Sequence, residues 1–79
     1  MNEKEIRRYD DLAKKLARHL GDIREEKGIA KVDLAQMSGL SRSAILKIEK
    51  GERIPSISTL MRIAVSLDVE LWKVLKDLT

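Results

Sequence analysis

The spacing of the apolar residues is the feature that most restricts the fold of this chain. These residues recur at steps of three and four and do not alternate, which is the period of an α helix and not of a strand. The first such series runs through Ile6, Tyr9, Leu12, Leu16, Leu20 and Ile23. Gly28 follows it, and a glycine commonly ends a helix because it adopts the left-handed conformation easily. The series predicts one long amphipathic helix and an all-α fold.

Four shorter helices are expected after the long one, because glycine, serine and proline divide the rest of the chain. Their apolar residues are, in order, Leu34, Ala35 and Met37; Ile45 and Ile48; Leu60, Met61, Ile63, Ala64 and Leu67; and those of the stretch Leu71 to Leu78. The dividing residues are Gly39 after the second helix, Ser41 as N-cap of the third, Gly51 after it, Pro55 in a turn, and Ser56 or Ser58 as N-cap of the fourth.

Length and composition narrow the class of protein. A chain of 79 residues makes one domain, and without cysteine and with one histidine it offers no disulfide framework, zinc cluster or thiol chemistry. It carries no apolar signal segment and no long apolar run. We therefore expect a cytoplasmic protein with no membrane association, no cofactor and no small-molecule ligand. Its net charge of +3 favours a polyanionic partner.

The informative stretch is residues 31–50, which reads KVDLAQMSGLSRSAILKIEK. Two short helices that meet at a sharp angle need a small residue where they cross, and Ala35 supplies it. Four residues later the turn needs a left-handed backbone, and Gly39 stands there. Apolar residues then occupy the positions that must seal the pair against the other helices: Leu34, Leu40, Ile45 and Ile48. This is the spacing of a helix-turn-helix.

Over residues 19–75 the chain resembles the Cro and phage-repressor type of helix-turn-helix regulator, the Xre-like family. The resemblance rests on separated elements that agree: Leu20, Ile23 and Arg24; Gly28; Leu34 and Ala35; Gly39; the IEKG at 48–51; Pro55; and Leu60, Ile63, Ala64 and Leu67. It implies a compact five-helix repressor-like DNA-binding domain, with the helix-turn-helix in helices 2 and 3. Residues 1–79 would form this single domain, in which 1–18 are a charged extension of the first helix and 19–75 the family core.

The resemblance also implies a function. A protein of this type is a sequence-specific transcription regulator that binds double-stranded DNA, a palindromic operator, as a homodimer through its third helix. The chain departs from the family pattern at the start of the second helix, where Ala30 and Lys31 replace a capping Ser or Thr and a phosphate-binding Gln. The change removes an N-cap hydroxyl worth on the order of 1 kcal/mol, while Lys31 keeps a charge for phosphate.

Base readout is expected from the face of the third helix that points away from Ile45 and Ile48. The residues on that face are Arg42, Ser43, Leu46 and Lys47. An arginine just after the N-cap can pair with guanine O6 and N7, and an apolar residue on a wet face suits a thymine methyl. A solvent-facing helix would also be polar there, but the helix-turn-helix around it favours readout.

Phosphate contacts are expected from the residues at the helix ends around this face: Lys31, Ser41, Lys50 and Arg53. Basic side chains at such places commonly hold phosphates, although each is also an ordinary surface charge. Two roles are open for Ser41. Its hydroxyl caps the third helix, and the N-terminal edge of that helix would approach a phosphate in the complex.

The resemblance also matches Arg24 and Glu49 to a partly buried salt bridge between the first and third helices. Such a pair is structural, and losing one partner would leave a poorly solvated charge. His19 has no constellation of Ser, Cys, Asp or Glu that points to catalysis, so we read it as a surface or packing residue.

A dimer contact is expected on the fifth helix. Its apolar stripe comprises Leu71, Val74, Leu75 and Leu78, with Trp72 at the edge. All five could belong to the core, but a domain this small cannot enclose them all, and tryptophan is a common interface anchor. We assign Leu71, Trp72, Leu75 and Leu78 to the dimer interface.

Two other classes of function stay open at this point. An antitoxin or other protein-interaction module of the same fold would bind mainly through Trp72 and the fifth helix, and Arg42 would be dispensable. An enzyme would need a nucleophile, an acid-base pair, a metal cluster or a phosphate loop, none of which the sequence contains. The sequence does not discriminate among phage repressors, restriction-modification controllers and antitoxins.

Overall fold

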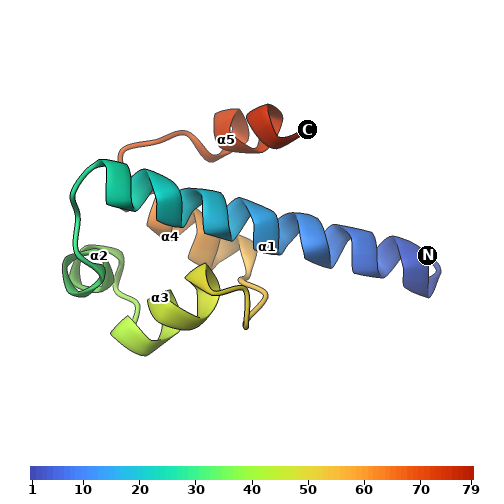
Figure 1. Cartoon of the computed structure of the whole chain (residues 1–79), viewed down its shortest axis with the longest axis horizontal. Helices are drawn as coiled ribbons and strands as arrows, with labels where there is room; N and C mark the ends of the chain where they lie inside the picture. The colour runs from blue at the N-terminus through green and yellow to red at the C-terminus, as the bar shows by residue number, and fades with distance from the viewer.

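Helix α1 (Glu3–Glu26) is the longest element of the computed structural model, which describes residues 1–79. It begins after Asn2, whose side-chain oxygen accepts a hydrogen bond from the backbone N–H of Glu5 at 2.9 Å. It ends before Gly28, which has a φ of +70°. The helix runs along most of the length of the molecule, with α2 and α3 on one side of it and α5 on the other (Figure 1).

Helices α2 (Lys31–Ser38) and α3 (Arg42–Glu49) form the expected helix-turn-helix. Gly39 has a φ of +73°, so the turn uses the left-handed conformation that glycine allows without steric cost. The Ser41 hydroxyl accepts a hydrogen bond from the N–H of Ala44 at 3.0 Å, whereas Ala30 gives α2 no side-chain cap. The prediction for Ser41 as a cap is confirmed, and the turn is set by local chemistry.

Helices α4 (Ile57–Ser66) and α5 (Leu71–Leu78) complete five helices and no strand, as expected. Of the two candidate caps of α4, Ser56 is the one used, because its hydroxyl accepts from the N–H of Thr59 at 3.1 Å. α2 packs on α3 and α4, and α1 contacts α3, α4 and α5. No helix is both long and apolar enough to cross a membrane.

The core lies beside the C-terminal half of α1 and draws on all five helices. Its buried members are Leu16, Ala17, Leu20, Leu34, Ala35, Ile45, Ile48, Leu60, Ile63, Leu67 and Val74. The N-terminal part of α1 has no core to cover it, and Ile6 and Tyr9 are exposed there. We call residues 3–12 the α1 overhang. It makes the molecule 39 Å long against 24 and 18 Å in the other directions (Figure 1).

Candidate nucleic-acid interface

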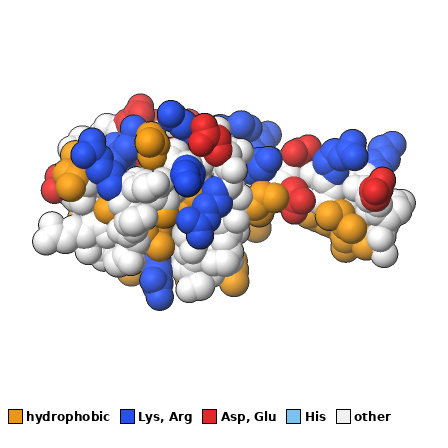
Figure 2. All heavy atoms as spheres, turned by 90° about the horizontal axis from the view of Figure 1, so that it is seen from below, with side chains coloured by type: hydrophobic (Ala, Val, Ile, Leu, Met, Phe, Trp, Pro, Cys, Tyr) orange, Lys and Arg blue, Asp and Glu red, His pale blue; other side chains and the backbone are white.

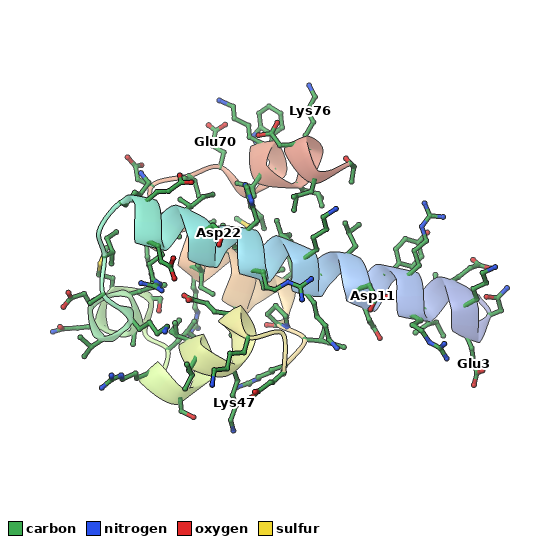
Figure 3. All side chains as sticks on the ribbon, in the orientation of Figure 1. Glu3, Asp11, Asp22, Lys47, Glu70 and Lys76 are labelled. Carbon is green, nitrogen blue, oxygen red and sulfur yellow. The ribbon has the colours of Figure 1, made fainter.

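The exposed face of α3 carries all four residues assigned to base readout. Arg42, Ser43, Leu46 and Lys47 are exposed, while Ala44, Ile45 and Ile48 on the opposite face are buried. Lys47 points away from α1 into solvent (Figure 3). Leu46 is an exposed apolar side chain among polar neighbours on this face, as a thymine methyl contact requires.

The residues assigned to phosphate contacts surround this face. Ser41 is the N-cap of α3, Lys50 its C-cap, and Arg53 lies in the loop that follows. All three are exposed, and Lys31, at the start of α2, is half-buried. Lys and Arg side chains gather on this side of the molecule (Figure 2). The arrangement places positive charge around an exposed helix, which is the pattern that suits a nucleic-acid backbone.

The structure brings Arg24 of α1 and Glu49 of α3 together in a bidentate ion pair. Arg24 Nε donates to Glu49 Oε2 at 2.7 Å and Nη2 donates to Oε1 at 2.9 Å. The third nitrogen, Nη1, donates to the backbone carbonyl of Ile29 at 2.6 Å. Only 7% of the Arg24 side chain and 14% of the Glu49 side chain are exposed. The hydrogen bond to Glu49 raises the pKa of Arg24, so the guanidinium stays charged.

Gly21 makes room for this ion pair, a role that the sequence analysis missed. A Cβ at this position would lie 3.1 Å from both Cγ and Cδ of Glu49. That separation is shorter than ordinary van der Waals contact. Glycine in the middle of a helix lowers its stability, so its use here has a packing reason. α1 and α3 approach closely because Gly21 has no side chain.

Arg18 is a further basic residue near the α3 face that the sequence analysis did not single out. A Cβ on Gly51 would lie 3.4 Å from Nη1 of Arg18, so the guanidinium rests beside the turn that follows Lys50. Arg18 is exposed and forms no ion pair within the chain. From α1, Arg18 therefore places one more positive charge beside the loop that carries Arg53.

The residues assigned to the dimer interface divide between core and surface. Leu71 and Leu78 are partly buried against the core, and their neighbour Val74 is buried. Trp72 is 60% exposed and Leu75 is 38% exposed. Lys73 Nζ lies 5.6 Å from the centroid of the Trp72 ring, within the range of a cation–π contact.

Trp72 and Leu75 belong to a larger apolar surface that includes α4, which the sequence analysis did not assign. Between α4 and α5 lies an open groove of about 510 Å³, which we call the α4/α5 groove. Its lining residues are Ile57, Met61, Ala64, Val65, Val69, Glu70, Leu71, Trp72 and Leu75. Ile57, Met61 and Val65 are exposed at steps of four residues and therefore share one face of α4.

No three residues of the His, Cys, Asp and Glu types lie together as they would around a metal ion. His19 is half-buried on α1, and no side-chain hydrogen bond or ion pair involves it.

Helices α2 and α3 are joined by a tight turn, the polar face of α3 is exposed, and basic residues surround that face. These features define a helix-turn-helix DNA-binding domain. Comparison with known proteins gives the family. A helix-turn-helix family model matches residues 20–71. The chain belongs to this family of DNA-binding transcription regulators, of the Xre and Cro type.

Individual relatives agree with this assignment. The ImmF control region 10 kDa protein of Bacillus phage phi105 is 40% identical over 58 residues, which cover 73% of this chain and 64% of the phage protein. The HTH-type transcriptional regulator SutR of Escherichia coli (strain K12) is 33% identical over 60 residues, 76% of this chain but 34% of SutR. The chain thus spans less than two thirds of both relatives.

One solved structure is similar to this chain over nearly the whole length of the solved protein. It is the restriction-modification controller protein C.AhdI from Aeromonas hydrophila, at 34% sequence identity and a TM-score of 0.72. The match covers 81% of this chain and 96% of the controller. The part of this chain that has no counterpart in the controller is therefore about a fifth of its length.

Proposed function

We propose that this chain is a sequence-specific transcription regulator that binds a palindromic operator in the cytoplasm as a homodimer, with α3 of each copy in the major groove. The observation that carries the proposal is the exposed face of α3. Arg42 and Lys47 offer donors for base acceptors and Leu46 offers an apolar surface for a thymine methyl. An exposed leucine between two cations gives no advantage to a helix face that contacts only water.

The surrounding cations support the same proposal through a different interaction. Lys50, Arg53 and Arg18 are exposed near the C-terminal end of α3, where they would meet phosphates. Such contacts fix the protein on the duplex without reading its sequence. The ion pair of Arg24 with Glu49 would hold α3 at a constant angle to α1, so that the readout side chains keep one geometry.

Dimerisation is supported by the apolar surface on α4 and α5. An exposed tryptophan beside an apolar groove is the composition that protein interfaces favour. Because a dimer with two-fold symmetry presents two α3 helices related by that axis, its operator has the same symmetry. The two helices would lie about one helical turn of DNA apart, roughly 34 Å.

One selection experiment tests this function directly. Random duplexes are enriched on the purified protein, and the bound fraction is sequenced. The expected result is an inverted repeat whose half-sites have centres separated by about ten base pairs or a multiple of a helical turn. Enrichment of no common sequence would refute sequence-specific binding, and a single half-site without symmetry would refute the homodimer on a palindrome.

A second candidate function is favoured by the α4/α5 groove. If the groove held a different protein, as in an antitoxin, the main role of the domain would be to bind that partner. Trp72 would then carry most of the binding free energy, and Arg42→Ala would leave the activity in the cell unchanged. Loss of regulation in the Arg42→Ala variant, with the groove intact, would decide in favour of DNA.

A further inference from the structure

The α1 overhang presents an apolar stripe that the rest of the chain leaves largely uncovered. Ile6 and Tyr9 are exposed, and Leu12 is half-buried where the overhang meets the domain. These residues continue the period of Leu16 and Leu20, which are core residues. Figure 2 shows hydrophobic side chains along one edge of the overhang and charged ones along the other. A helix with such a free apolar side gains stability when a partner covers that side.

The α4/α5 groove is an apolar surface that likewise has no occupant within the chain. Its lining is apolar except for Glu70, and its most exposed members are Val65, Ile57 and Trp72. A groove lined in this way accepts the apolar side of an amphipathic helix, with side chains anchored at steps of three and four residues. Ile6 and Tyr9 have that spacing.

The stripe of α5 connects the two surfaces. Leu78 lines a hollow together with Tyr9 and Leu12 of α1, whereas Leu71 and Leu75 line the α4/α5 groove. Leucines at positions 71, 75 and 78 share one side of α5. The apolar surface of the overhang is therefore continuous, through α5, with the surface that we assign to the dimer.

The charges that border the two surfaces are complementary. Lys4, Arg8 and Lys15 follow at steps of four and seven residues and so lie on one flank of the overhang stripe. Asp68, Glu70 and Asp77 line a hollow that shares Val65, Val69 and Glu70 with the α4/α5 groove. Lys73 pairs with Glu70 at 3.2 Å, which leaves Asp68 and Asp77 without a basic partner in the chain. The basic flank of the overhang could therefore pair with the acidic residues that border the α4/α5 groove.

We propose that the α1 overhang is an exchanged arm: in the homodimer, the overhang of each copy lies in the α4/α5 groove of the other. This inference rests on the proposed homodimer and specifies how its interface is made. Each copy has one overhang and one groove, so a two-fold axis fills both grooves at once. Direct packing of one groove on the other would leave Ile6 and Tyr9 exposed in the dimer.

The absence of cysteine from the chain allows a clean test by cross-linking. Glu5→Cys puts one thiol on the overhang and Val65→Cys puts one on the exposed lining of the groove, and both residues are exposed. The two variants, one of them carrying a mass tag, are mixed, left to exchange subunits and treated with a short bismaleimide. Arm exchange predicts covalent heterodimers in the mixture and few covalent dimers of either variant alone. Val32→Cys on α2, mixed with Val65→Cys, is the control and should give none.

Other outcomes of this test would overturn the arm. Efficient cross-linking of Val65→Cys with itself, without heterodimers in the mixture, would establish direct packing of groove on groove. Sedimentation of the unaltered protein as a monomer, at concentrations that saturate the operator, would refute the arm together with the homodimer. A dimer that gives no heterodimeric cross-link would refute the arm alone and leave the proposed function standing.

A second measurement separates the arm from a helix that is merely exposed. Tyr9 and Val32 are both 55% exposed, and neither belongs to the core. Tyr9→Glu should weaken dimerisation by about tenfold or more, as loss of an aromatic interface residue does. Val32→Glu should leave the dimer unchanged, and helix content should be similar in both variants. Equal dimer affinity in the two variants would overturn the proposal.

Discussion

The carboxylate side chain of Glu49 lies directly over the backbone of Gly21, so close that a Cβ on the glycine would lie 3.1 Å from its Cγ and Cδ. The carboxylate cannot retreat freely, because Arg24 binds both of its oxygens. Gly21, Arg24 and Glu49 therefore act together to set the approach of α3 to α1.

The Gly21→Ala variant should be less stable than the unaltered protein. Alanine raises helix propensity by about 1 kcal/mol. Overpacking against the fixed Glu49 side chain costs about 1–3 kcal/mol, so a net loss of about 1 kcal/mol is expected. Chemical denaturation measures it, with Asp22→Ala as the control, because Asp22 is exposed on the same helix. If Gly21→Ala instead raised stability, as the same change does at an exposed helix position, Glu49 would have moved aside without cost.

Removing one member of the ion pair should destabilise the fold strongly. Arg24→Ala leaves the shielded carboxylate of Glu49 unpaired, and a loss of about 3 kcal/mol is expected. The double variant Arg24→Met with Glu49→Leu should recover most of that loss, because it leaves no unpaired charge. Denaturation of the single and double variants checks this. A double variant as unstable as Arg24→Ala would contradict the explanation.

The stability that Arg24 contributes should not change across neutral pH. A pKa raised in the folded state gives stability that is fully present below the unfolded pKa and is lost only as pH rises through the folded value. The ordinary pKa of arginine already lies far above neutral pH, and the hydrogen bond to Glu49 raises that of Arg24 further. The difference in unfolding free energy between the unaltered protein and the double variant Arg24→Met with Glu49→Leu, which leaves no unpaired carboxylate, should therefore be constant from about pH 6 to 9. A steep change in that interval would assign the effect to another group.

Base readout and phosphate binding should respond differently to mutation. Arg42→Ala should weaken binding to the selected operator by about 1–3 kcal/mol with little effect on random DNA, because only a base contact discriminates. Lys50→Ala and Arg53→Ala should weaken both complexes together. Titrations on both DNAs at several salt concentrations provide the measurement. Equal losses on operator and random DNA for Arg42→Ala would make it a phosphate contact, and readout would pass to Ser43, Leu46, Lys47 or DNA shape.

Arg18 should behave as a phosphate contact although it lies on α1. Arg18→Ala is expected to lower the magnitude of the slope of log K against log salt by about one unit on any sequence. Lys76→Ala is the matched control, because Lys76 points away from the α3 side of the molecule (Figure 3). An unchanged slope for Arg18→Ala would mean that its guanidinium only rests against the turn at Gly51.

Much of this protein followed from the sequence by itself. The five helices, the Ser41 cap, the turn at Gly39 and the outward face of α3 were predicted correctly, because each depends on residues a few positions apart. The family was recognised because several separated short elements between Leu20 and Leu67 agree with its pattern. The α3 residues that would read bases were placed on one exposed face, since the helical period alone puts them there.

Only the tertiary structure decided how distant parts of the chain meet. Periodicity shows that a helix has an apolar side, but it does not show how far the core extends along that side. It could not show that Ile6 and Tyr9 lie beyond the core, or that Ile57, Met61 and Val65 stay exposed. The positions of Gly21 under Glu49 and of Arg18 beside Gly51 depend on packing between α1 and α3, which residues far apart in the chain create together.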